Sequence, residues 1–132
     1  MKLHSDSTAS SLQITAYDAH SVVIGERRLT SAFAITPQVL IVELPAIAVQ
    51  RLRWDGLRAL HELDLEVLLI GTGSRQQFPD VGFYRDFCGE LSKQRIGVEV
   101  MTSPAACRTF NILAADNRRV AAVITFDHGA DS

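Results

Sequence analysis

Apolar and polar positions alternate in short runs through the first half of the chain. These runs predict strands over residues 12–17, 22–24, 29–35 and 39–42, separated by turn residues. Thr36–Pro37 ends the third strand, because proline lacks an amide donor and favours extended backbone before it. The front half therefore predicts a β-rich meander.

The second half alternates helical and strand-like periods. The spacing predicts helices over about 55–63, from Pro79–Asp80 to the turn before Gly97, and from Pro104 to about Asp116. Between and after them, strands are expected over 66–70, 98–101 and 120–126. The run Val67–Ile70 is wholly apolar, which is typical of a central parallel strand buried on both faces.

The ends of the expected helices carry capping residues. Gly97 is the candidate C-cap of the second helix. Thr102 or Ser103 can N-cap the third, with Pro104 at its first position, and Asn117 can take the left-handed place after it. The order, β-rich first and then α-β-α-β-α-β, predicts an α/β fold with a mostly parallel or mixed sheet and helices packed on it.

Composition and charge narrow the class of protein. The 132 residues suit one domain, expected over residues 11–127, with flexible segments at 1–10 and 128–132. A net charge of −2 argues against nucleic-acid binding through a basic face. Two distant cysteines, Cys88 and Cys107, suit neither a disulfide framework nor a zinc site. Without a signal peptide or an apolar run long enough to span a bilayer, we expect a cytoplasmic protein.

Two loops are expected to meet at one edge of the sheet, because the carboxyl ends of parallel strands gather there. They are Gly71–Pro79 and Met101–Thr109. The first loop, with Thr72 between two glycines and Arg75 beyond, is either a tight turn or a cradle for an anion. It lacks the third glycine of a dinucleotide fingerprint, since Gln76 stands there, and it has no P-loop sequence.

The second loop leads into a helix that carries a thiol and three polar residues. Cys107 is either a reactive thiol near a helix start or a small residue packed under the sheet, and no histidine lies near it in sequence. Arg108 and Asn111 share a helix face and either pair within the fold or face a ligand. Thr109 can bond back to a helix carbonyl.

Four sequence blocks resemble one known family. They are Glu66–Gly73, Gly97–Thr102, Ala105–Leu113 and Arg118–Ala122. In this order they look like the family of small uncharacterised α/β domains that includes the mitochondrial complex I assembly factor 3. The resemblance implies a three-layer fold with a mixed central sheet and an additional N-terminal β-rich layer. It implies no established enzyme activity, and a role in complex assembly beside protein partners.

The resemblance also marks single positions. Gly71, Gly73, Thr102, Ala106, Thr109 and Asn111 match the family pattern and are expected to form a site or a structural hallmark. Two functions follow. The first is a non-enzymatic interaction or assembly module without cofactor or metal, whose partners are proteins such as respiratory-complex assembly components. The alternative is a small-ligand binder or enzyme that uses the cleft between residues 71–79 and 101–109.

Overall fold

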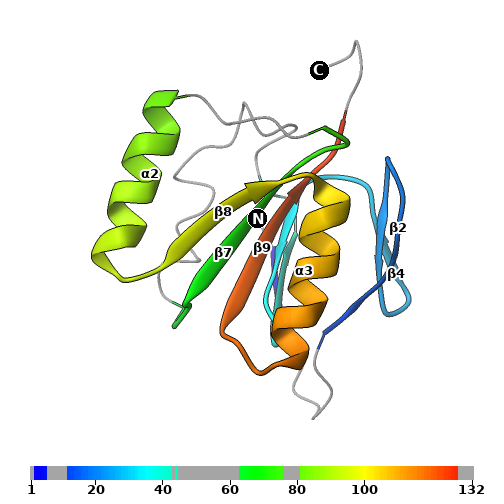
Figure 1. Cartoon of the computed structure of the whole chain (residues 1–132). Helices are drawn as coiled ribbons and strands as arrows, with labels where there is room; N and C mark the ends of the chain where they lie inside the picture. The colour runs from blue at the N-terminus through cyan, green and yellow to red at the C-terminus, as the bar shows by residue number, and fades with distance from the viewer. Residues whose placement is uncertain (1, 6–11, 43, 45–62, 76–80, 128–132) are drawn as a thin grey trace.

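The structure is a computed structural model that describes residues 2–5, 12–42, 44, 63–75 and 81–127. Over these residues the chain forms two helices and two β-sheets, arranged as in Figure 1. The strands are β1 (Lys2–Ser5), β2 (Ile14–Tyr17), β3 (Val22–Ile24), β4 (Arg27–Leu29), β5 (Phe33–Ile35), β6 (Val39–Val42), β7 (Val67–Thr72), β8 (Gly97–Met101) and β9 (Val120–Thr125). The helices are α2 (Val81–Lys93) and α3 (Ser103–Ala115).

The larger sheet has six strands in the order β1-β6-β5-β9-β7-β8. β7 runs parallel to both β8 and β9, whereas β5 is antiparallel to β9 and to β6. The sheet is therefore mixed, as expected, and its three parallel strands belong to the second half of the chain. Every residue of β7 and β9 is buried, which confirms the prediction of a strand covered on both faces.

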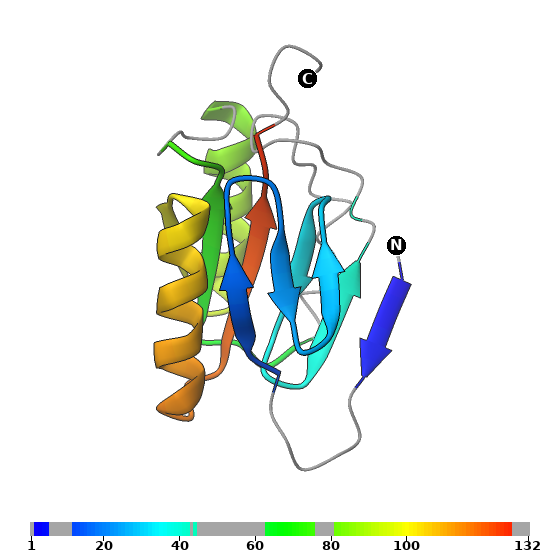
Figure 2. The same cartoon turned by 90° about the vertical axis from the view of Figure 1, so that its right-hand side faces the viewer.

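Three layers are formed because each face of this sheet is covered (Figure 2). One face of the sheet, with Leu69 and Ala122, packs against α3 and against the small sheet β2-β3-β4. The other face, with Leu68 and Ala121, packs against Phe87 and other apolar side chains of α2. The period of two along each strand produces this division, since successive side chains point to opposite faces. The expected three-layer α/β fold is confirmed.

The expected strand over 29–35 is wrong, because it is two strands in two sheets. β4 ends at Leu29 in the small sheet, and β5 begins at Phe33 in the large one. Thr30 and Ser31 between them are exposed, and the chain crosses from one layer to the other there. An apolar run has the same period in either sheet, so the pattern did not reveal the crossing.

The N-terminus also differs from expectation. Residues 1–10 were expected to be flexible, yet Lys2–Ser5 form β1 and pair antiparallel with β6. Pairing at a sheet edge uses backbone groups, so a polar segment can join without apolar side chains. The helix expected over 55–63 and the tail at 128–132 lie outside the described residues.

The helix ends follow the capping rules with two corrections. Helix α2 ends at Lys93, and the left-handed residue after it is Arg95 (φ 62°), not Gly97, which already belongs to β8. Thr102 is the N-cap of α3, so Pro104 takes the second helical position. Asn117 adopts the expected left-handed conformation, with φ 60°.

Candidate functional site

The carboxyl ends of β7, β8 and β9 meet at one edge of the large sheet. Gly71 lies opposite Met101 on one side and Ile124 on the other. The two candidate loops leave the sheet from this edge, so the expected meeting of residues 71–75 with residues 101–105 is observed. Residues 76–79 of the first loop lie outside the described part.

Ser103 holds this edge together. Its hydroxyl donates to the carbonyl of Thr125 at 2.6 Å and accepts from the amide of Gly73 at 2.9 Å. Its amide donates to the carbonyl of Gly73 at 2.8 Å. The hydroxyl of Thr125 donates in turn to the carbonyl of Gly71 at 2.6 Å. Sequence reasoning treated Ser103 only as a possible helix cap, and the tertiary pairing of the loops is what makes it central.

Steric constraints explain why glycine stands at two positions of the first loop. A Cβ on Gly71 would lie 2.8 Å from the Oγ and 3.0 Å from the Cα of Ser103. Gly73 has φ +96°, a backbone conformation that favours glycine, and a Cβ there would collide with the carboxylate of Asp127. Both glycines therefore permit close approach of other parts of the chain.

Asp127 closes the other side of the loop. Its carboxylate accepts from the hydroxyl and from the amide of Ser74, the latter at 3.1 Å. The Ser74 side-chain hydrogen bond, the Ser74 amide and the charge of Arg75 together keep the pKa of Asp127 below its ordinary value. Thr72 lies buried, and its hydroxyl donates to the carbonyl of Arg75 at 2.7 Å.

Several amides of these loops already have hydrogen-bond partners. Those of Gly73 and Ser74 donate to Ser103 and Asp127, and that of Ala105 donates to the Thr102 hydroxyl at 3.3 Å. The pocket beside Ser103 has a volume of about 10 Å³, at the lower limit of the space that one water needs. The described part of these loops therefore gives the hypothesis of a ligand cleft no support, and it stays a prediction.

Cys107 is fully buried beneath the sheet. Burial raises the pKa of its thiol to about 12, and the opposing effect of Arg108 is smaller. A thiol with this pKa stays protonated at neutral pH and is a poor nucleophile. Of the two interpretations of Cys107, packing is the one that the geometry favours. Ala106 is buried in the same core.

Asn111 joins α3 to the small sheet. Its side-chain oxygen accepts from the amide of Ile14 at 3.1 Å, and its side-chain nitrogen donates to the carbonyl of Ile14 at 2.8 Å. The side chain thus pairs with strand β2 as a neighbouring strand would. Arg108, three residues earlier, donates to the hydroxyl of Tyr17 at 3.2 Å. Both residues make contacts within the fold, and Thr109 lies half-buried between them.

A larger pocket than the one beside Ser103 lies elsewhere. It has a volume of about 410 Å³ and is lined by residues before β7, before β9 and in the β5–β6 turn. Arg118 and Arg119 stand at its rim. Its other lining residues are spread over three distant segments, so no local motif indicates it. Within the part of the chain that is described, no group of three or more His, Cys, Asp and Glu side chains could hold a metal ion.

A family model described as "Protein of unknown function (DUF498/DUF598)" matches residues 14–125 of this chain. The chain belongs to this family. The matched range begins at β2 and ends at β9, so it contains both sheets except β1 and both helices. The resemblance inferred from the four sequence blocks is confirmed.

Solved structures of bacterial proteins share the DUF498/DUF598 fold of this chain. A Bordetella parapertussis crystal structure has a TM-score of 0.77 and 29% identity, over 92% of this chain and 100% of that one. A Xanthomonas campestris NMR structure has a TM-score of 0.77 and 31% identity, over 100% and 99%. A Bordetella pertussis structure described as a Mth938-like domain has a TM-score of 0.70 and 26% identity, over 100% and 98%.

Curated relatives of this family member include animal assembly factors. A Danio rerio protein named NADH dehydrogenase [ubiquinone] 1 alpha subcomplex assembly factor 3 is 40% identical over 65 residues, 49% of this chain and 35% of that protein. The Xenopus tropicalis protein of the same name is 26% identical over 125 residues, 93% of this chain and 65% of that protein. A Francisella tularensis protein named 13 kDa major membrane protein is 30% identical over 58% of each chain. The chain thus spans about one to two thirds of the length of these relatives.

Neither described helix is long and apolar enough to cross a membrane.

Proposed function

We propose that this chain is a non-enzymatic protein-interaction module that assists the assembly of a respiratory complex. The observation that carries the proposal is the alignment with the Xenopus tropicalis assembly factor 3, which extends over 93% of the chain. That alignment is long enough to include both sheets and both helices of the fold. The assembly role in the printed name belongs to that relative, and its transfer to this chain is the proposal.

The geometry at the strand ends supports a module without chemistry of its own. The hydroxyl of Ser103, the amides of Gly73 and Ser74 and the carboxylate of Asp127 hydrogen-bond to one another or to the backbone. The thiol of Cys107 is buried and stays protonated at neutral pH. These groups stabilise the fold, and they are not arranged as a nucleophile with a neighbouring base.

An exposed row of side chains on α3 and β2 suits a protein partner. Ile112 is 67% exposed and Tyr17 is 36% exposed, and these are the large apolar side chains that the described residues leave at the surface. Arg108 lies one helical turn from Ile112 and hydrogen-bonds to Tyr17. Tyrosine and arginine are enriched among the residues that contribute most to protein–protein binding. We call Tyr17, Arg108 and Ile112 the α3 ridge.

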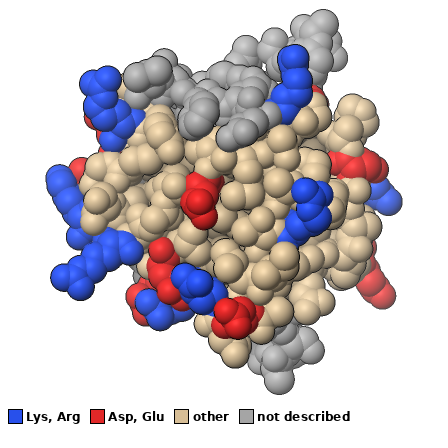
Figure 3. All heavy atoms as spheres, in the orientation of Figure 1, with Lys and Arg blue, Asp and Glu red and all other residues tan. Residues whose placement is uncertain are grey.

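Charge over the rest of this side is mixed. Figure 3 shows acidic and basic side chains interspersed on one face of the described part, without a broad region of one sign. A surface of this kind favours recognition by shape and local contacts over attachment to a polyanion.

A crosslinking experiment in cells tests the α3 ridge as the binding surface. A photoreactive amino acid would replace Ile112 in one strain and the exposed Ser92 of α2 in another, and mass spectrometry would identify the crosslinked proteins. We expect subunits or other assembly proteins of a respiratory complex at position 112 and not at position 92. The same proteins at both positions, or no respiratory protein at position 112, contradicts this surface.

Deletion of the gene tests the assembly role itself. In the deletion strain we expect native gels to show less of the assembled respiratory complex. The wild-type chain should restore its amount, and so should the control variant Arg85→Glu, which changes an exposed residue of α2. The double variant Arg108→Glu/Ile112→Asp should not restore it. An unchanged amount of complex in the deletion strain means that the proposed role is wrong. Circular dichroism of each purified variant establishes that it is folded.

A further inference from the structure

The pocket of about 410 Å³ lies at the amino-terminal ends of β7 and β9, opposite the edge held by Ser103. Its inner wall is apolar. Leu65 and Val120 are buried there, and Val39 and Leu63 are half-buried. The volume falls within the roughly 300–1,000 Å³ of small-molecule sites, which are also lined mainly by apolar side chains. The pocket can therefore enclose the apolar part of a small molecule.

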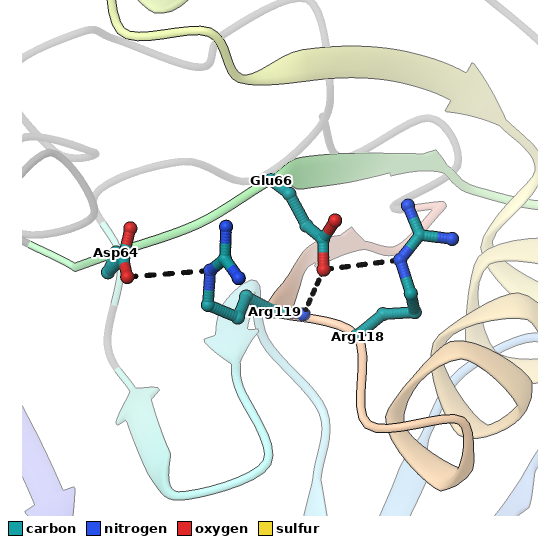
Figure 4. A network of polar contacts seen from close by, with 4 residues as sticks. All are labelled: Asp64, Glu66, Arg118 and Arg119. Carbon is teal, nitrogen blue, oxygen red and sulfur yellow. Dashed lines mark hydrogen bonds and ion pairs between the residues drawn. The ribbon is translucent and has the colours of Figure 1, made fainter.

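Two consecutive arginines stand at the rim. The Nε atom of Arg118 lies 3.1 Å from the Oε1 of Glu66, and the Nε of Arg119 lies 3.4 Å from the Oδ2 of Asp64 (Figure 4). Each ion pair thus uses the inner nitrogen of a guanidinium. The outer amino nitrogens of both groups have no hydrogen-bond partner among the described residues. Two neighbouring guanidinium nitrogens match the spacing of two oxygens in a carboxylate or a phosphate.

The two arginines are held in place from the backbone. The carbonyl of Arg119 accepts from the amide of Glu66 at 2.8 Å, and the amide of Arg119 donates to the Glu66 carboxylate at 2.8 Å. That amide and the Arg118 side chain hold the pKa of Glu66 below its ordinary value, so the carboxylate stays charged at neutral pH. The backbone of both arginines is therefore fixed at the end of the buried sheet. Less conformational entropy is lost when a ligand binds there.

Each rim arginine has one carboxylate partner among the described residues, Glu66 for Arg118 and Asp64 for Arg119. The side chain of Asp64 is 90% exposed, so solvent strongly screens its charge. The pocket thus combines an apolar wall with two guanidinium groups whose outer nitrogens are free among the described residues.

We propose that this pocket binds a small organic anion, with its apolar body against Val39 and Leu63 and its oxyanion head at Arg118 and Arg119. The ligand carries either a carboxylate or a phosphate on an aliphatic or aromatic body. This site is separate from the α3 ridge, so it does not depend on the proposed assembly role.

A two-dimensional NMR titration of the full chain tests the proposal. The probes are octanoate and octyl phosphate below their micelle concentrations, and they distinguish a carboxylate from a phosphate head. We expect saturable shifts of the amides of 63–66 and 118–120 with at least one of them. Acetate and inorganic phosphate lack the apolar body, 1-octanol lacks the charge, and each is expected to bind at least tenfold more weakly.

Charge variants give the second arm of the test. Arg118→Gln/Arg119→Gln is expected to weaken the binding of the better probe at least tenfold, whereas Arg27→Gln, an exposed arginine on β4 in the other sheet, leaves it unchanged. If the double glutamine variant does not fold, Arg118→Lys/Arg119→Lys keeps the charge and loses the fork, with a weakening of several-fold expected. The proposal is overturned by the absence of any saturable shift, by 1-octanol binding as tightly as the anions, or by unchanged binding in the folded variants.

Discussion

Ser103 lies where the three parallel strands end, and its hydroxyl bonds to two of the segments that meet there. It accepts from Gly73 and donates to Thr125, while Gly71 leaves the space that the Ser103 side chain occupies. A buried hydroxyl must find partners, since leaving it unpaired costs about 1–3 kcal/mol. The pair Gly71 and Ser103 is therefore a packing unit, and this explains a glycine in a strand that is otherwise β-branched and leucine-rich.

Two glycine substitutions are expected to have opposite effects on stability. Gly71→Ala places a methyl group 2.8 Å from the Oγ of Ser103, and overpacking of this kind costs about 1–3 kcal/mol. Gly89→Ala in α2 meets nothing within 4 Å, and alanine in a helix is favoured over glycine by about 0.5–1 kcal/mol. Urea unfolding monitored by circular dichroism measures both free energies. A destabilisation of equal size in the two variants means that close packing at Gly71 is not the cause.

The two cysteines are expected to differ in reactivity. Cys107 is fully buried and its pKa is raised to about 12, so iodoacetamide at pH 8 should not modify it in the folded chain. Cys88 is half-exposed and should be labelled first. Mass spectrometry before and after addition of urea counts the modified thiols. In the Cys88→Ser variant we expect no label without urea and one label with it, and rapid labelling of the folded variant contradicts a buried, protonated Cys107.

Each side of helix α3 faces a different part of the structure. Its inner side carries Ala106, Cys107 and Phe110 into the core, and Asn111 at its edge pairs with β2. The side of Arg108 and Ile112 faces solvent. One element thus joins the large sheet, the small sheet and the surface, which explains why a polar residue stands beside the buried Phe110.

Loss of Asn111 is expected to loosen the small sheet. Asn111→Ala removes both hydrogen bonds to Ile14, and we expect a loss of about 1–3 kcal/mol in the free energy of unfolding. Hydrogen exchange should show the Ile14 amide exchanging much faster than the amides of β7. Ile112→Ala on the same helix is the control, and a change within about 0.5 kcal/mol is expected because its side chain is 67% exposed. Equal protection of Ile14 in the two variants contradicts the role of Asn111 as a clamp.

The described elements of the second half could be predicted well from their periods. The strands over 67–72 and 97–101 and helix α3 with its Thr102 cap follow local patterns of apolar and capping residues. The prediction of one strand over residues 29–35 is wrong, because the sheet to which a strand belongs depends on its partner strands and not on its own sequence pattern. The left-handed residue after helix α2 is Arg95 and not the expected Gly97, because the helix already ends at Lys93.

At the scale of the whole molecule, two ends of one sheet have different characters. The carboxyl end of β7 is closed by Ser103, Gly73 and Asp127, with a pocket of about 10 Å³. The amino-terminal end has a pocket of about 410 Å³ with two arginines at its rim. Ligands of parallel sheets commonly bind at the carboxyl end, and for that reason the sequence predicts a site at the end that Ser103 holds together.

Acid is expected to destabilise the molecule through its hydrogen-bonded carboxylates. Asp18, Glu66 and Asp127 have pKa values below their ordinary values, because amides of His20 and Arg119 and the Ser74 hydroxyl, respectively, are the main donors to them. A carboxyl group with a lowered folded pKa binds protons more readily when the chain is unfolded. The stabilisation is therefore complete above the unfolded pKa values of 3.8 to 4.5 and is lost as the pH falls below them.

Urea unfolding between pH 7 and pH 3 measures this loss. Asp127→Asn should show a smaller fall in unfolding free energy between these pH values than the wild type, since one of the three groups is removed. Glu26→Gln alters an exposed carboxylate on the β3–β4 hairpin and should keep the wild-type dependence. The same pH dependence of the unfolding free energy in wild type and Asp127→Asn means that Asp127 does not contribute to the loss of stability in acid.

The candidate site could be predicted only in part. The meeting of the two loops follows from parallel strands, and the glycines and Thr102 were found from local turn and capping chemistry. The partners of Arg108 and Asn111 lie 91 and 97 residues away along the chain, so no local pattern could name them. The pocket beside the rim arginines could not be predicted either, because its wall comes from separate segments of the chain.

The sequence by itself determined the α/β class, most strand positions, the caps of α3 and, through four blocks, the family of this chain. These features depend on local periods and on residues close together in the chain. The tertiary structure alone decided that the amides of Gly73 and Ser74 have hydrogen-bond partners, that Cys107 is buried and that a pocket lies at the other end of the sheet. The physical reason is that hydrogen-bond satisfaction, burial and cavity volume depend on groups which only folding brings together.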